Sequence, residues 1–251
     1  MARARWDGDA LEGLEEVFVA DAAASGGQHF GSRIVFDEER YLYVTVGERG
    51  LQAPAQDLSN HIGTTVRLGD DGSAPADNPF VGQEDARSEI FTYGNRNAQG
   101  MAMHPATGKI WQTEHGPRGG DELNRMEPGG NYGWPNYNFG NHYNGQPIAD
   151  PDSGSGTVIP VLHWTPAIAP SGLTFYTGDR FPEWQGDAFI GSLTGRHIRR
   201  VILDGEDVVG EESLIADRGH RIRAVVDGPD GYLYFLTDSS QGIMGRLEPQ
   251  R

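Results

Sequence analysis

Short apolar segments separated by polar turns recur along the chain and predict strands. In the clearest copies, an apolar segment, a polar turn and a second apolar segment follow one another. These pairs are residues 33–36 with 41–45, 100–105 with 109–113, 172–176 with 187–192, and 222–226 with 232–237. Third segments follow at 65–68 and 198–203, and each leads to an Asp-Gly turn. Apolar runs of this length between turn residues predict a small antiparallel sheet that repeats along the chain.

The recurrence of this unit predicts an all-β fold of the β-propeller type. Repeated small sheets with almost no helical periodicity are typical of blades arranged around a channel. A β-sandwich is the alternative, but it gives no reason for the same order of strands and turns to recur. A chain of 251 residues can bury a sizeable core, and we expect residues 1–251 to form one propeller domain.

Composition and charge narrow the classes of function. The chain has 36 Asp and Glu residues against 20 Lys and Arg and no basic stripe, so nucleic acid is not an expected partner. It has no cysteine, which excludes disulfides, thiolate metal sites and a cysteine nucleophile. We expect no membrane span, because no apolar stretch is long enough, and no signal peptide, because the first residues lack an apolar core.

Candidate metal ligands are concentrated in residues 114–124, which a glycine-framed turn at 130–135 follows closely. The run combines carboxylates, a histidine and the adjacent backbone carbonyls of Gly116 and Pro117. Hard oxygen donors of this kind are the ligands that calcium prefers. The run therefore indicates a calcium site, although Asp121 and Glu122 are also typical of a solvated loop.

Five motifs together resemble those of a known enzyme family. They are residues 28–33, 47–48, 93–100, 114–124 and 218–223. Their order and sequence resemble those of the soluble aldose sugar dehydrogenases of the glucose/sorbosone dehydrogenase family. The resemblance extends over nearly the whole chain. This family uses pyrroloquinoline quinone (PQQ) and has a six-bladed propeller. The resemblance implies oxidation of aldose sugars at C1 to lactones, with the hydride passed to the quinone and the electrons passed on to an external acceptor.

The resemblance also implies catalytic roles for three residues. His29 matches the general base, a role that suits an imidazole near neutral pH, and Glu48 would orient it. Arg96 and Asn97 match residues that face the quinone oxygens, where a fixed cation stabilises developing charge. Taken alone, His29 is more typical of a surface loop histidine, and Arg96 of a turn.

Further residues are expected at the cofactor and at two calcium ions because of the same resemblance. Those near the cofactor are His115, Trp164, Thr194, Arg196, Arg221 and Arg223. Thr194 stands where the family usually has a lysine, with Arg196 as a substitute, and a buried tryptophan between blades would look like Trp164 in sequence. The carbonyls of Gly116 and Pro117 match the ligands of a calcium that holds the cofactor. Glu122 and the Tyr132 carbonyl match a second, structural calcium site.

The beginning of the chain departs from the family pattern. Residues 2–5 resemble a strand inside the family's second blade, so we expect the first blade to be missing and about four to five blades to be present. A ring that does not close leaves unpaired strand edges, which favour association into a homo-oligomer. The family resemblance implies a periplasmic or secreted location.

Two other functions stay open at this point. One is a calcium-dependent propeller lactonase, in which the metal would polarise a lactone carbonyl and no redox cofactor is needed. The other is a non-catalytic, calcium-stabilised propeller that binds carbohydrate. Redox absorbance distinguishes both from a quinone-dependent dehydrogenase.

Overall fold

The computed structural model describes residues 1–152 and 154–249, and strands dominate it. Its only helices in this part of the chain are three short 3₁₀ turns at Ala53–Gln56, Pro182–Trp184 and Ala216–Arg218. None of the described helices is long and apolar enough to cross a membrane. The prediction of an all-β fold is confirmed.

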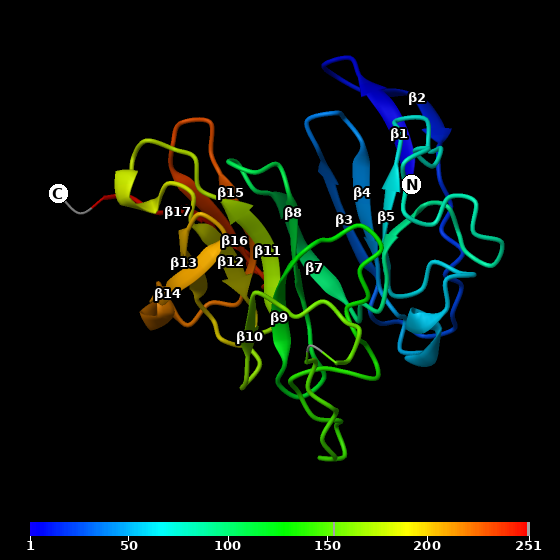
Figure 1. The fold of residues 1–251 in the computed structure, drawn as a ribbon. Coiled ribbons are helices and arrows are strands. Elements are labelled where there is room, and N and C mark those ends of the chain that lie inside the picture. The colour runs from blue at the N-terminus through cyan, green and yellow to red at the C-terminus, as the bar shows by residue number, and fades with distance from the viewer. Residues whose placement is uncertain (153, 250–251) are drawn as a thin grey trace.

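The strands form antiparallel sheets that follow one another along the chain (Figure 1). A hairpin of β1 (Ala2–Trp6) and β2 (Leu11–Glu16) comes first. The next sheet contains β3 (Gly31–Phe36), β4 (Leu42–Val46), β5 (Thr64–Leu68) and β6 (Ile90–Thr92). The third contains β7 (Ala98–Met103), β8 (Ile110–Glu114), β9 (Asp121–Arg125) and β10 (Leu162–Trp164). The fourth contains β11 (Pro170–Phe175), β12 (Ala188–Ser192), β13 (Ile198–Asp204) and β14 (Asp207–Leu214). The last contains β15 (Ile222–Asp227), β16 (Leu233–Thr237) and β17 (Met244–Arg246).

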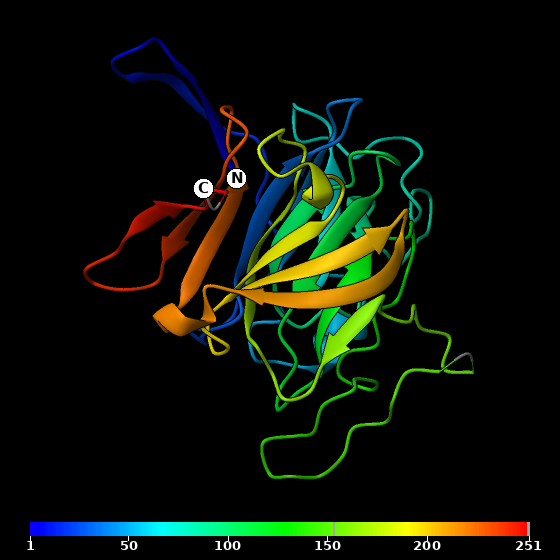
Figure 2. The ribbon, with the colours of Figure 1, turned by 90° about the vertical axis from the view of Figure 1, so that its left-hand side faces the viewer.

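These sheets are arranged as successive blades. The first strands of neighbouring sheets pack together, β3 against β7, β7 against β11, and β11 against β15. Figures 1 and 2 show the sheets side by side in an arc, with the β1–β2 hairpin beyond β3. Four sheets and one hairpin match the expected four to five blades of a propeller-type fold, and every strand predicted from the apolar segments is present.

The hydrophobic core lies between adjacent blades. Trp111 and Leu123 of the third sheet pack with Leu173, Ile190 and Val201 of the fourth, and this cluster is buried. Full burial of one such side chain stabilises the fold by about 1.5–3 kcal/mol. Packing between sheets therefore fixes the positions of the loops that connect them.

Candidate active site

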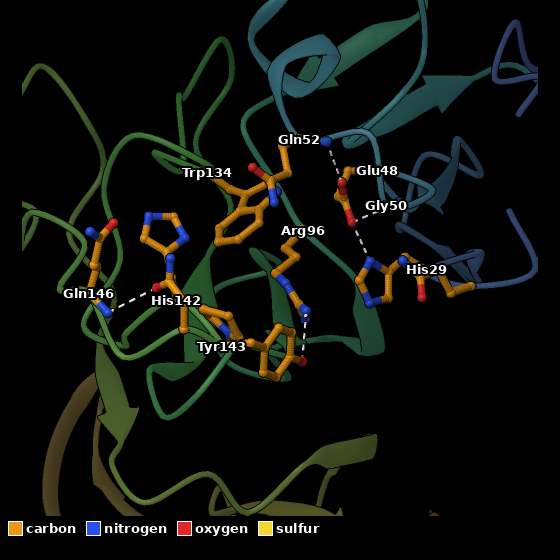
Figure 3. Close-up of a pocket in the computed structure, with 12 residues that line it drawn as sticks. His29, Glu48, Gly50, Gln52, Arg96, Trp134, His142, Tyr143 and Gln146 are labelled. Carbon is orange, nitrogen blue, oxygen red and sulfur yellow. Dashed lines mark hydrogen bonds and ion pairs between the residues drawn. The ribbon is translucent and has the colours of Figure 1, made fainter.

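A cavity of about 510 Å³ lies where loops from the second and third sheets meet. Its lining combines charged, amide and aromatic side chains (Figure 3). The lining residues are Gln28, His29, Glu48, Gly50, Gln52, Arg96, Pro117, Trp134, His142, Tyr143, Asn144 and Gln146. A concave site with a few convergent polar groups is typical of a small-molecule binding site.

His29 and Glu48 form a hydrogen-bonded pair on one wall of the cavity. His29 immediately precedes β3, and the backbone of Gly47 at the end of β4 lies directly against it. A Cβ at position 47 would lie 1.9 Å from the His29 carbonyl oxygen, so only glycine permits this approach. The His29 Nδ1 contacts Glu48 Oε1, which brings the predicted base and its orienting carboxylate together.

Glu48 is well suited to remain ionised although its side chain is buried. Its carboxylate accepts backbone hydrogen bonds from Gly50 at 2.9 Å and Gln52 at 2.6 Å. Burial acts to raise the pKa of Glu48, but the hydrogen bonds from His29 and the two backbone N–H groups outweigh it, and the pKa lies below its usual value. An ionised carboxylate accepts a hydrogen bond from a protonated Nδ1. His29 Nε2 is then the basic nitrogen.

Arg96 is buried and lies between His29 and Tyr143 in Figure 3. Its Nη1 donates to the backbone carbonyls of Gly116 at 2.9 Å and His115 at 3.2 Å. Its Nη2 lies 3.2 Å from the Tyr143 hydroxyl, and its guanidinium carbon is 5.2 Å from the centre of the Trp134 ring. The Gly116 carbonyl, a predicted calcium ligand, thus already binds a cationic group of the chain.

Asn97 is connected to Arg223 through Gln99, and Arg221 shares a carboxylate partner with Arg223. Asn97 Oδ1 accepts a hydrogen bond from Gln99 Nε2 at 3.1 Å, and Gln99 Oε1 accepts one from Arg223 Nη1 at 3.4 Å. Arg221 and Arg223 both form ion pairs with Asp238, at 2.8 and 3.3 Å. The two arginines therefore converge on one carboxylate, as their alternation along the chain predicts.

His115 is held beside Arg96 in its neutral form. Burial lowers its pKa to about 4, although the hydrogen bond to the Pro170 carbonyl opposes this shift. That bond joins Nε2 to the carbonyl oxygen at 2.7 Å, so Nε2 carries the proton. Because the His115 imidazole is neutral, Arg96 is the residue of this pair that carries a fixed positive charge.

Three carboxyl groups, Glu114, Asp121 and Glu122, form what we call the carboxylate layer. Glu114 ends β8 and faces Glu122 of β9, and all three side chains are buried. The alternative of a solvated loop at Asp121 and Glu122 is therefore wrong, because these residues begin a strand whose polar side chains point inward. A contiguous polar segment can form a buried strand where neighbouring amides form hydrogen bonds with its side chains. The amides of Asn124 and Asn138 donate such bonds to the Glu122 carboxylate at 3.1 and 2.9 Å.

The pKa values of the carboxylate layer are all raised. Burial raises the pKa of Glu114 and of Asp121 to about 6. Burial and the charge of Glu114 hold the pKa of Glu122 well above its usual value. Among the described residues, no group of three or more His, Cys, Asp or Glu side chains is arranged to hold a metal ion. Any cation bound by Glu122 would therefore need backbone or amide oxygens as well.

Several predicted site residues lie outside the cavity lining. Trp164 is buried in the core between blades, and its Nε1 donates to Glu211 at 2.7 Å. Thr194 and Arg196 are exposed in the turn after β12. Tyr132 is buried, and its hydroxyl donates to the Arg125 carbonyl at 2.7 Å. Asn97, His115, Gly116, Glu122, Arg221 and Arg223 also lie outside the lining, and the roles of all the predicted site residues stay predictions.

Sequence reasoning missed several residues on the cavity wall. They are Gln28, Gln52, Trp134, His142, Tyr143, Asn144 and Gln146. The stretch 136–149 contains no strand, and its polar and aromatic residues follow no repeat. The one signal of a binding loop in this stretch is its content of hydrogen-bonding and aromatic side chains in a connection that forms no strand of a blade.

Comparison with known proteins agrees with this arrangement of blades. Residues 1–246 match the model of a family described as glucose/sorbosone dehydrogenase. The aldose sugar dehydrogenase YliI of Escherichia coli K12 is 46% identical over 228 residues, which cover 90% of this chain and 62% of that protein.

Solved structures show the same likeness. The apo form of the soluble aldose sugar dehydrogenase of Escherichia coli superimposes with a TM-score of 0.94 at 43% identity, covering 99% of this chain and 72% of that one. The PQQ-bound aldose sugar dehydrogenase of Streptomyces coelicolor gives a TM-score of 0.79 at 28% identity, covering 98% and 69%.

The fold is that of soluble glucose and aldose sugar dehydrogenases of known structure. The chain belongs to the glucose/sorbosone dehydrogenase family, as the resemblance of its motifs predicts. It spans less than two thirds of the length of curated relatives that it matches, 62% in the case of YliI.

Proposed function

We propose that this chain oxidises aldose sugars at C1 to lactones, with PQQ and calcium bound and an external acceptor taking the electrons. The observation that carries this proposal is the His29–Glu48 pair, which opens on a cavity shared with Arg96. A base held by an ionised carboxylate next to a fixed cation is the arrangement that removal of a hydroxyl proton requires.

His29 takes the proton of the C1 hydroxyl at Nε2. Its Nδ1 remains bonded to Glu48, which fixes the tautomer and stabilises the imidazolium that forms. The backbone donors to Glu48 prevent that carboxylate from turning away during the reaction. The cavity walls keep the sugar in the orientation that brings its C1 hydroxyl to His29.

The residues at the predicted calcium site fit a hard cation. The Gly116 carbonyl accepts one hydrogen bond from Arg96 at 2.9 Å, which leaves its second lone pair for a cation. A Cβ at Gly116 would lie 2.2 and 2.4 Å from the carbonyl oxygens of Gly119 and Gly120, which shows how closely carbonyl groups gather there. Oxygen donors of this density suit calcium, which Gly116 and Pro117 would hold through their carbonyls.

Arg96 on the cavity wall, together with residues that lie outside the cavity lining, would also fit a cofactor with several carboxylates. Arg96 supplies one fixed positive charge, and Arg221 and Arg223 supply two more that Asp238 orients. Asn97 is connected to Arg223 through Gln99 and would donate to an oxygen of the quinone ring. When bound, PQQ supplies the two-electron acceptor that no side chain can provide.

Reconstitution tests this function directly. The purified chain is mixed with PQQ and calcium, and the oxidation of D-glucose is followed with a redox dye while the absorbance spectrum is recorded. The proposal expects turnover together with a shifted quinone band. Hydrolysis of a lactone without any quinone band would favour the calcium-dependent lactonase instead, and sugar binding without turnover would favour a carbohydrate-binding protein.

A further inference from the structure

A short hairpin at residues 141–147 forms the wall of the cavity on the far side of Arg96 from His29 (Figure 3). Two backbone hydrogen bonds, both 3.1 Å, join Asn141 to Arg118. Within the hairpin, His142 N–H donates to the Gln146 carbonyl at 2.8 Å, and Gly145 at the turn has φ +89°. The hairpin is thus tied to the chain directly beyond Gly116 and Pro117.

The hairpin presents an open aromatic ring and unused hydrogen-bonding groups to the cavity. Tyr143 is 74% exposed and lines the cavity, so its ring is accessible to a ligand there. Its hydroxyl lies 3.2 Å from Arg96 Nη2, and the guanidinium carbon of Arg96 lies 6.0 Å from the centre of its ring. Within residues 1–152 and 154–249, the side chains of His142 and Gln146 form no hydrogen bond with the protein.

An aldopyranose has matching chemistry. Its C–H groups form an apolar face, and its hydroxyls form a polar rim that both donates and accepts hydrogen bonds. A sugar whose C1 hydroxyl reaches His29 has C4, the ring atom opposite C1, and the exocyclic C6 hydroxymethyl group directed away from that residue. The wall opposite His29 is the hairpin.

We infer that Tyr143 and Gln146 are specificity-determining residues, which recognise the end of an aldopyranose remote from C1. The Tyr143 ring supports the apolar face of the sugar, and the Gln146 amide binds the C6 hydroxyl. The hairpin therefore favours aldohexoses over aldopentoses, which lack the C6 hydroxymethyl group. This inference rests on the proposed oxidation at C1 for the orientation of the sugar.

The test compares D-glucose and D-xylose in steady-state kinetics of the reconstituted chain. Tyr143→Ala is expected to raise the KM for both sugars about tenfold while kcat changes less than about threefold, because binding is lost equally in the ground and transition states. Tyr143→Phe keeps the ring and should raise KM only about two- to threefold. Gln146→Leu should lower the glucose-to-xylose ratio of kcat/KM about tenfold.

Controls separate recognition of the sugar from positioning of Arg96. Ile159→Ala changes an exposed side chain of the same long connection that does not line the cavity, and it should leave both KM values unchanged. If Tyr143→Phe lowers kcat as much as Tyr143→Ala, the hydroxyl serves only to hold Arg96 and the inference is overturned. An unchanged sugar ratio in Gln146→Leu would overturn the assignment of that residue.

Calorimetry with 1,5-anhydro-D-glucitol, which has no C1 hydroxyl to oxidise, distinguishes failure of this inference from failure of the proposed function. Weaker binding to Tyr143→Ala than to the unmodified chain supports the inference, even if no aldose is oxidised. Turnover of D-glucose with identical kinetics in all variants overturns the inference and leaves the proposed function standing. Neither turnover nor binding in the unmodified chain overturns both.

Discussion

Glu48 and the carboxylate layer are both buried, yet their environments shift the pKa values of their carboxyl groups in opposite directions. Glu48 has two backbone N–H donors and His29, and its pKa lies below the usual value. Glu114, Asp121 and Glu122 also accept hydrogen bonds, but burial dominates and their pKa values rise. The difference favours Glu48 as the charged partner of the proposed base, whereas Glu122 would gain most from a nearby positive charge.

The largest effect is expected when His29, the proposed base that Glu48 binds, is replaced. His29→Gln should lower kcat for D-glucose about 10²- to 10⁴-fold, because no other imidazole lines that wall of the cavity. Dye-linked oxidation measures the loss, and the absorbance of bound PQQ should be retained. The matched control is His163→Gln, an exposed histidine on β10. Undiminished turnover in His29→Gln would show that the base lies elsewhere.

Calcium should stabilise the fold if it binds at Glu122 together with backbone or amide oxygens. At a hundredfold excess over its dissociation constant, a ligand that binds only the folded chain adds about 2.7 kcal/mol to the free energy of unfolding. The corresponding rise in melting temperature is on the order of 5–10 °C for a chain of this size. Thermal unfolding at pH 7.5 in calcium and in chelator measures it, with magnesium as the control. Equal melting temperatures in calcium and in chelator would contradict a calcium site.

The strands were the most predictable part of the molecule, and the site was predictable only in pieces. Apolar segments such as 172–176 and 187–192 show their strands directly, because strands buried on both faces are apolar along nearly their whole length. Strand β9 has no such signal, since its inward residues Glu122 and Asn124 are polar. The pairing of His29 with Glu48 rested on family motifs. The Tyr143 hairpin depends on its long-range pairing with Arg118, which no local pattern encodes.

A smaller effect is expected when the charge of Glu48 is removed and its shape is kept. Glu48→Gln should lower kcat about 10- to 100-fold, because its amide cannot accept hydrogen bonds at both oxygen positions and no longer stabilises the imidazolium. The acidic limb of the pH–rate profile should move to lower pH, since a nearby negative charge favours protonation of the base. Glu38→Gln, in an exposed turn, is the control. A profile identical to that of the unmodified chain would exclude an electrostatic role for Glu48.

The smallest effect is expected at Glu122. Its substitution should stabilise the fold, whereas the substitutions above should lower activity. The pKa values of Asp121 and Glu114 rise from their usual 3.8 and 4.5 to about 6. The folded chain therefore binds more protons than the unfolded chain across this range, and the free energy of unfolding falls as the pH rises through it. Above pH 6 in chelator, Glu122→Gln should relieve repulsion with Glu114 and raise the free energy of unfolding by about 1 kcal/mol.

The same variant should respond differently once calcium is added. Glu122→Gln lacks a charged ligand, so calcium should stabilise it less than the unmodified chain, and the order of stability should reverse between the two conditions. Urea unfolding at pH 7.5 measures both, with Glu127→Gln as the control because that side chain is exposed. Loss of stability in chelator would show that Glu122 contributes through its hydrogen bonds with Asn124 and Asn138, and the contrast with Glu48 would then disappear.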